Sequence, residues 1–220
     1  FKNEKFQYFK IKNLISDIFA LGKEFLAFSV FRKDSNINEK YLLSELRRRN
    51  LDTAFEQAYR LADKSLEKTK AKDEIYYHHK MDLQFEIMSY YSPKKPNVNF
   101  HYMLEMLDLF VSYSLISLLN MYNIMLHENN QNNYSFDMKM FDNVMDYLKD
   151  SSFTNNPTLE VYYNILLMEK TKDEKYFYVL KDLRNKYKDS LTPFDNYMLY
   201  LHMDSYCTTA YNEQCRTDLL

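Results

Sequence analysis

The chain of 220 residues contains a single glycine, Gly22, and this scarcity limits its folds more than any other feature. Tight turns between β-strands need residues that tolerate positive φ, chiefly glycine and asparagine. Doubly wound α/β folds need glycine at their strand-to-helix turns, and phosphate-binding loops are rich in it. One glycine therefore excludes a phosphate loop of the Walker or Rossmann kind. It favours an all-helical fold, in which asparagine can close helices.

Helical periodicity of apolar residues runs along almost the whole chain, whereas sustained strand alternation is rare. Polar connectors separate the periodic segments, and the proline-containing run 92–97 is the clearest break. Asn38 is expected to cap a helix at its start and Asn50 to close one, with Gly22 as a candidate break. The predicted helices cover residues 4–31, 38–49, 51–70, 73–91, 99–127, 136–149, 158–170, 173–190 and 193–215.

Short connectors make consecutive helices lie antiparallel, so the fold class expected is all-α, with helical hairpins stacked in an array. Residues 1–220 are expected to form one such domain. Because the sequence begins with Phe1 rather than Met, we also expect that it can be a piece of a longer chain. The hydrophobic fraction of 46% and the charged fraction of 27% are typical of a folded, water-soluble chain.

One stretch suggests a repeat. Pro157 and Pro193 each open a helix rich in Tyr, Leu and Met, and between them a turn at residues 171–173 joins two helices. This unit resembles a tetratricopeptide repeat, whose period is about 34 residues. Tyr163 and Leu166 fall on the large apolar positions of that motif. Its small positions differ, since Leu167 replaces a glycine, and Val179 and Lys186 replace alanines. The resemblance covers this unit and implies a right-handed, repeat-like helical array that binds another protein or peptide.

Net charge gives no reason to expect nucleic acid or an anionic membrane as the main partner. The chain carries 29 basic and 31 acidic residues, mixed along its length, for a net charge of −2. Arg47–Arg49 is the densest basic cluster, and it leaves an RNA-associated helical repeat open as an alternative. The same arginines also suit the last turn of a helix, where cations complement the negative end of the dipole.

Two further features bear on the compartment. The uncharged segment Leu109–Leu126 is long enough to test as a membrane span. Its serines and asparagines, and the flanking Glu105 and Asp108, favour a buried central helix instead, so no membrane span is expected. Cys207 and Cys215 would lie about 12 Å apart along one helix, too far for a disulfide. A reducing, cytoplasmic location is therefore expected.

The stretch 72–91, KDEIYYHHKMDLQFEIMSYY, has the strongest look of a chemical site. On a helix, Glu74, His78, Asp82 and Glu86 follow one another at a spacing of four and form a polar stripe. At about 100° per residue, His79 points to a different side, so the two rings are not expected to bind one metal. A metal-dependent or acid–base enzyme that uses Glu74, His78 and Asp82 with distant residues is kept as an alternative.

The apolar residues of the same helix form two arcs on roughly opposite sides. Two arcs predict a helix packed between two neighbours, as in the interior of a stacked array. One arc comprises Tyr76, His79, Leu83, Ile87 and Tyr90, and the other Tyr77, Met81, Phe85 and Met88.

The remaining histidines, His101, His127 and His202, are isolated in the sequence, and His127 is expected near a helix C-terminus, where the dipole favours it. Cys207 and Cys215 lack the local signature of a nucleophile. We therefore expect no catalytic, cofactor-binding or metal-binding residues and no cofactor. The leading hypothesis is a non-catalytic scaffold or adaptor for protein–protein interaction, whose partner and oligomeric state the sequence leaves open.

Overall fold

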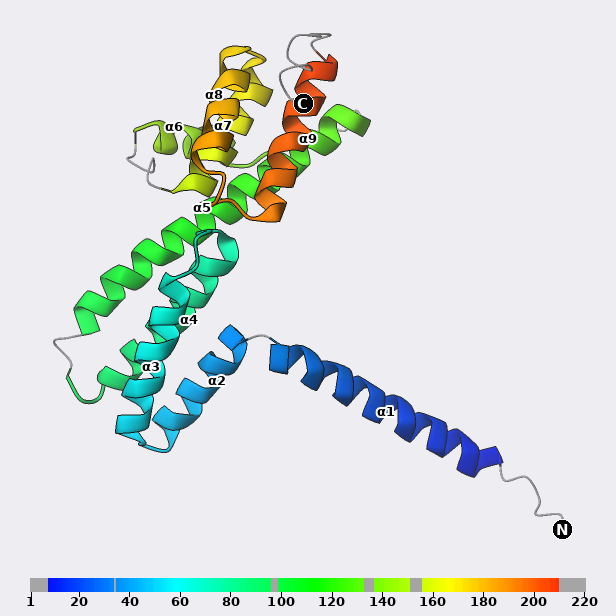
Figure 1. Ribbon diagram of the computed structural model, residues 1–220, viewed down its shortest axis with the longest axis vertical. Coiled ribbons are helices and arrows are strands. Elements are labelled where there is room, and N and C mark those ends of the chain that lie inside the picture. Colours follow the sequence, from blue (N-terminus) through cyan, green and yellow to red (C-terminus); the bar gives the residue numbers. More distant parts are fainter. Residues whose placement is uncertain (1–7, 34, 96–98, 133–136, 151–155, 210–220) are drawn as a thin grey trace. The chain divides into compact units, whose positions relative to one another are not determined.

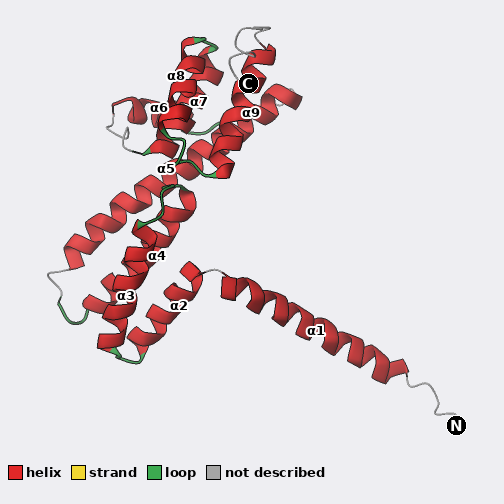
Figure 2. Ribbon diagram, viewed as in Figure 1, coloured by secondary structure: helices red, strands yellow, loops and turns green. Residues whose placement is uncertain are grey.

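The computed structural model describes residues 8–33, 35–95, 99–132, 137–150 and 156–209. Within these ranges the protein consists of nine α-helices with no strand, which confirms the all-α prediction (Figures 1 and 2). The helices are α1 (Tyr8–Lys33), α2 (Ser35–Arg48), α3 (Asp52–Glu67), α4 (Glu74–Tyr91), α5 (Asn99–Asn132), α6 (Phe141–Asp150), α7 (Pro157–Thr171), α8 (Lys175–Lys186) and α9 (Pro193–Thr209).

The chain divides into two compact units, Phe1–Ala62 and Asp63–Leu220, with the boundary inside α3. The single domain expected over residues 1–220 stays a prediction. In the first unit, α1 and α2 are linked by a hydrogen bond from Asn38 Nδ2 to the carbonyl oxygen of Phe31, 2.7 Å long. Asn38 was expected to cap a helix, but α2 already begins at Ser35, so the prediction is wrong and the asparagine fixes the junction instead.

Helix α1 is continuous through Gly22, which therefore does not break it. A helix interior tolerates one glycine at a cost of about 1 kcal/mol relative to alanine. Most of the large apolar side chains of α1 are exposed, and Phe25 is 71% accessible. Asn50 closes α2 with a positive φ of 55°, as expected.

The second unit is organised around α5, the longest helix (Figure 1). Helix α4 packs along the N-terminal half of α5, and α7 packs on its C-terminal half. Helices α8 and α9 pack against α7. The core lies in this second region. It contains fully buried side chains from several helices, among them Leu119, Tyr162, Ile165, Phe177 and Leu199.

The helix ends in the core region follow local rules. Pro157 occupies the first turn of α7, as expected, and the side chain of Asn156 caps that turn by accepting the Leu159 amide at 3.1 Å. Lys172 closes α7 in the left-handed region with φ 54°, which produces the predicted turn at 171–173. Thr192 and Asp195 cap α9 reciprocally, because each side chain accepts the backbone amide of the other.

The predicted end of the fifth helix is wrong. Of the run 128–133, expected to be a polar connector, residues 128–132 continue α5 to Asn132, and residue 133 lies outside the described part. Asn132 Nδ2 donates to Glu128 Oε2 one turn earlier at 2.8 Å, and such pairs support an exposed helix even where asparagine has low propensity. His127 consequently lies inside the helix and not near its C-terminus. Of the predicted ninth helix, residues 210–215, including Cys215, lie outside the described part.

Candidate functional site

Helices α4 and α5 run antiparallel and side by side. The rings of Tyr91 and Tyr102 stack at 5.8 Å with nearly parallel planes, at one end of the pair. Further along, Gln84 Nε2 donates to Glu105 Oε2 at 2.5 Å. These contacts hold α4 and α5 together along one side of the pair. The other side is open.

An apolar groove of about 960 Å³ follows the open side of the pair, and we call it the α4–α5 groove. Its apolar side chains are strongly exposed: Phe100 is 66% and Leu107 56% accessible. The groove is lined by Met81, Met88, Ser89, Ser92, Pro93, Phe100, Met103, Leu104, Met106, Leu107 and Phe110. Four methionines and two phenylalanines give it a large, adaptable hydrophobic surface.

The expectation that α4 packs between two neighbours is confirmed in part. Helix α5 packs against it and Lys80 binds Asp63 and Glu67 of α3, but the second apolar arc is not covered. The first arc is buried as predicted at Tyr76, Leu83, Ile87 and Tyr90. In the second arc, Phe85 is exposed, while Met81 and Met88 line the groove. The periodicity identified both arcs correctly, but a sequence period cannot say whether a neighbouring helix covers an apolar face.

The polar stripe predicted on α4 is likewise only partly at the surface. His78 is exposed and its Nδ1 lies 3.8 Å from Asp82 Oδ2, as the spacing of four predicts. Glu86, expected to continue this stripe, is buried with 3% accessibility.

The structure brings His79 to the same place as His78, against the angular argument. Ligand atoms of His78, His79 and Asp82 all lie within 4.8 Å of one another, and the two rings meet edge to face at 5.8 Å. The 100° step describes where each Cβ points, whereas rotation about χ1 and χ2 swings the rings back toward each other. The predicted separation of the two rings is therefore wrong.

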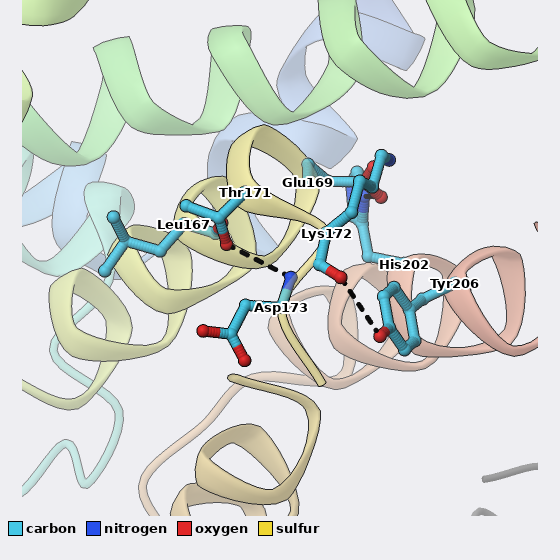
Figure 3. Close-up of polar contacts among 7 residues, drawn as sticks. All are labelled: Leu167, Glu169, Thr171, Lys172, Asp173, His202 and Tyr206. Atoms are coloured by element: carbon cyan, nitrogen blue, oxygen red, sulfur yellow. Dashed lines mark hydrogen bonds and ion pairs between the residues drawn. The ribbon is translucent and has the colours of Figure 1, made fainter. Parts of the chain in front are cut away.

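A second polar cluster, which the sequence did not reveal, lies in the core between α7 and α9 (Figure 3). Glu169 Oε1 lies 2.9 Å from His202 Nδ1, and Oε2 accepts from Lys172 Nζ at 2.6 Å. The imidazole is fully inaccessible, and the carboxylate side chain is 2% exposed. Because an ionised carboxylate only accepts hydrogen bonds, this pairing places a proton on Nδ1.

Polar atoms from α5 lie in the same core. The rings of His127 and His202 are 5.8 Å apart, which joins α5 to α9. His202 Nε2, His127 Nδ1 and both amide atoms of Asn123 are buried with no hydrogen-bond partner among the described residues. This set carries a desolvation cost that the surrounding packing must offset.

The carboxyl of Glu169 has a shifted pKa. Burial raises the pKa, but the hydrogen bonds from His202 and Lys172 outweigh it and hold the pKa below its ordinary value near 4.5. A lowered folded-state pKa contributes stability that is present above the unfolded value and lost as pH falls through the folded one.

We therefore expect the free energy of unfolding to decline as the pH falls below about 4.5. Urea denaturation at a series of pH values measures this, with Glu169→Leu as the comparison. The variant should show a shallower decline over this range, because it has no carboxyl to protonate. Parallel declines in both proteins would contradict a stabilising role for the ionised Glu169.

Two of the arginines considered for RNA binding form ion pairs with a nearby glutamate. Arg48 binds Glu45 through Nε at 2.8 Å and through Nη2 at 2.7 Å, and Arg49 Nε donates to the same carboxylate at 2.6 Å. The hydrogen bonds from Arg48 and Arg49 lower the pKa of Glu45 to about 2, so the carboxylate stays charged. The basic cluster is thus partly neutralised by its own helix.

Helix α5 is long and apolar enough over Phe100–Asn129 to cross a membrane, and 28% of the most apolar window is buried in the protein. Among the described residues no other helix meets that description.

No protein-family model, curated protein or solved structure matches the chain. The groove and the polar clusters are therefore the features that bear on its function.

Proposed function

We propose that the protein is a non-catalytic scaffold or adaptor, and that its α4–α5 groove binds an amphipathic helix of a partner protein. The observation that carries the proposal is the groove itself, about 960 Å³ in volume and lined by exposed Met, Leu and Phe side chains. Contiguous apolar surface of this kind is unfavourable in water and usually marks a binding site.

The shape and chemistry of the groove fit one recurring mode of recognition, in which a helix lays its apolar face between two others. The lining residues of α5 run from Phe100 to Phe110, a length of about 15 Å or three helical turns. Anchors at spacings of three and four along a partner helix match this length. Methionine side chains are flexible and polarisable, so they adapt to different anchors.

The charges beside the groove favour an acidic partner helix. Lys94 and Lys95 are exposed and directly follow Pro93, which lines the groove. Their Nζ atoms lie 3.7 Å and 5.7 Å from the ring centres of Tyr90 and Tyr91, so the two lysines stand at the end of the groove and do not line it. Carboxylates in the partner would steer association and fix its orientation more than they would raise affinity.

The wider proposal keeps the repeat-like architecture and a cytoplasmic location. Support for stacked, tetratricopeptide-like hairpins comes from the α7–α8 pair, which is joined by the tight turn at Lys172, and from α9, which packs on α7. Among the polar clusters, the Glu169–His202 pair is inaccessible to a substrate in this arrangement. We therefore assign it a structural role and do not base an enzymatic function on it.

Binding is tested with labelled amphipathic peptides of about five turns that carry Leu or Phe at helical spacing and acidic residues on the other face. Fluorescence anisotropy measures the affinity. Leu107→Asp places a charge in the groove and should weaken binding at least about tenfold. Ile75→Asp is the matched control, since Ile75 is 63% exposed on α4 but does not line the groove.

The same two variants test whether the natural partner protein binds at the groove. In pull-downs, the partner should be retained by the unmodified protein and by Ile75→Asp but not by Leu107→Asp. If no peptide binds below about 100 μM, or if both variants bind equally, the groove is not the docking site.

A further inference from the structure

We propose that His78, His79 and Asp82 form a binding site for a divalent transition-metal ion, with Zn²⁺ as the ion to test, on the surface of α4. This site is separate from the α4–α5 groove, and the inference does not depend on the protein-binding proposal. It rests on the ligand atoms of all three side chains, which lie within 4.8 Å of one another.

The distances are close to those of a coordinated ion. In a tetrahedral site with bonds of about 2.0–2.1 Å, two ligand atoms are about 3.3 Å apart. His78 Nδ1 and Asp82 Oδ2 are already 3.8 Å apart, so this pair needs to close by only about half an ångström. The most separated atoms of the cluster need to close by about 1.5 Å.

The His78 side chain can move to close much of this distance. The His78 side chain is 52% exposed, and its ring lies at centre-to-centre distances of 5.8 Å from the rings of His79 and of Tyr113 on α5. Small rotations about χ1 and χ2 within one rotamer well move a ring nitrogen by this amount. The exposed position also lets a hydrated ion reach the ligands without any opening of the fold.

The ligand types select the class of ion. Two imidazole nitrogens and one carboxylate oxygen suit Zn²⁺, Ni²⁺ or Cu²⁺, whereas Ca²⁺ and Mg²⁺ prefer all-oxygen sites. Three protein ligands leave at least one position for water or for a group from another molecule. The site is therefore an open one, able to accept a further ligand from outside the chain.

Metal binding is coupled to the helix. The three ligands belong to residues one, three and four positions apart, and they converge only while α4 is helical. An ion that binds this arrangement but not the unfolded chain raises the stability of the fold by mass action. A rise in the melting temperature with added Zn²⁺ is thus a second readout besides direct binding.

His101 on α5 supplies a matched control. Its Nε2 lies 2.9 Å from Glu105 Oε1, the same histidine–carboxylate spacing of four as His78 and Asp82, at a shorter distance. The side chain of His101 is 73% exposed. It belongs to no group of three or more candidate ligands among the described residues. Replacing His101 therefore removes one histidine and its exposed pair with Glu105 but leaves the proposed metal site unchanged.

The experiment is a calorimetric titration of the full chain, freed of metal, with ZnCl₂. We expect one site that His78→Gln and His79→Gln each weaken at least about tenfold, while His101→Gln leaves it unchanged. The melting temperature should rise with Zn²⁺ in the unmodified protein and in His101→Gln, and less in the other two variants. Circular dichroism confirms that each variant is folded.

Two results would overturn the proposal. One is an absence of Zn²⁺ binding at about 100 μM ion. The other is binding that persists equally in His78→Gln and His79→Gln, which would place the ion elsewhere. Leu107→Asp should bind Zn²⁺ normally, so a failure of the groove proposal and a failure of the metal proposal are distinguishable.

Discussion

Replacing Glu169 by leucine should lower the free energy of unfolding by about 2 kcal/mol, because it removes the charged acceptor of a buried histidine and leaves that imidazole unpaired. The carboxylate binds both His202 and Lys172, and its side chain is 2% exposed. In the variant, His202 Nδ1 stays in the core without its acceptor, at the desolvation cost of an unpaired polar group. Urea denaturation followed by circular dichroism measures the change.

Asp142→Asn is the comparison for this variant. Asp142 accepts from Lys170 on the same helix as Glu169 at 2.5 Å, but its side chain is 78% exposed. Water screens such a pair, so little change in stability is expected. Replacing His202 as well as Glu169 by leucine should recover part of the loss, since no unpaired polar group then remains at the pair. Equal stability of Glu169→Leu and the unmodified protein would show that the pair is not stabilising.

Replacing Asp195 by alanine should cost about 3 kcal/mol, because this carboxylate serves two structural purposes. Its Oδ2 accepts the backbone amide and the hydroxyl of Thr192 and so caps the start of α9. Its Oδ1 accepts the buried hydroxyl of Tyr162 on α7 at 2.7 Å. Losing the cap costs about 1 kcal/mol, and the stranded tyrosine hydroxyl accounts for the rest.

A second variant separates the two contributions. Tyr162→Phe removes only the hydroxyl and should cost less than Asp195→Ala, with the cap of α9 intact. Asp204→Ala, on the exposed side of α9, should leave stability almost unchanged. If Asp195→Ala lowers the free energy of unfolding no more than Asp204→Ala does, Asp195 does not stabilise the contact between α7 and α9. The pKa of Tyr162 is raised by burial and by the nearby Asp195 charge, so its phenol stays protonated and able to donate.

The helix ends show where sequence rules suffice. Pro157, Asn50 and the turn at 171–173 were placed correctly, because each has a backbone conformation that its residue type favours locally. The end of α5 was misjudged, because an asparagine-rich run has low helix propensity in isolation. Extension of a long helix that is already anchored by packing overrides that weak preference.

The candidate sites were less accessible to sequence reasoning. Met81 and Met88 were correctly assigned to an apolar arc, but their place in an open groove depends on which helix pairs with α4. Glu169 and His202 come from different helices, and only packing of α7 against α9 makes them partners. His78 and His79 are adjacent in sequence, yet their convergence is a matter of side-chain torsions that the helical period does not contain.

The sequence by itself determined the all-helical class and the approximate position of most helices. Scarce glycine and a persistent helical period act residue by residue, so they can be read without the fold. Only the tertiary structure decided that the second apolar arc of α4 lines an open groove and that a histidine and a glutamate pair in the core. Burial and pairing are set by contacts between different helices, and local propensity carries no information about those contacts.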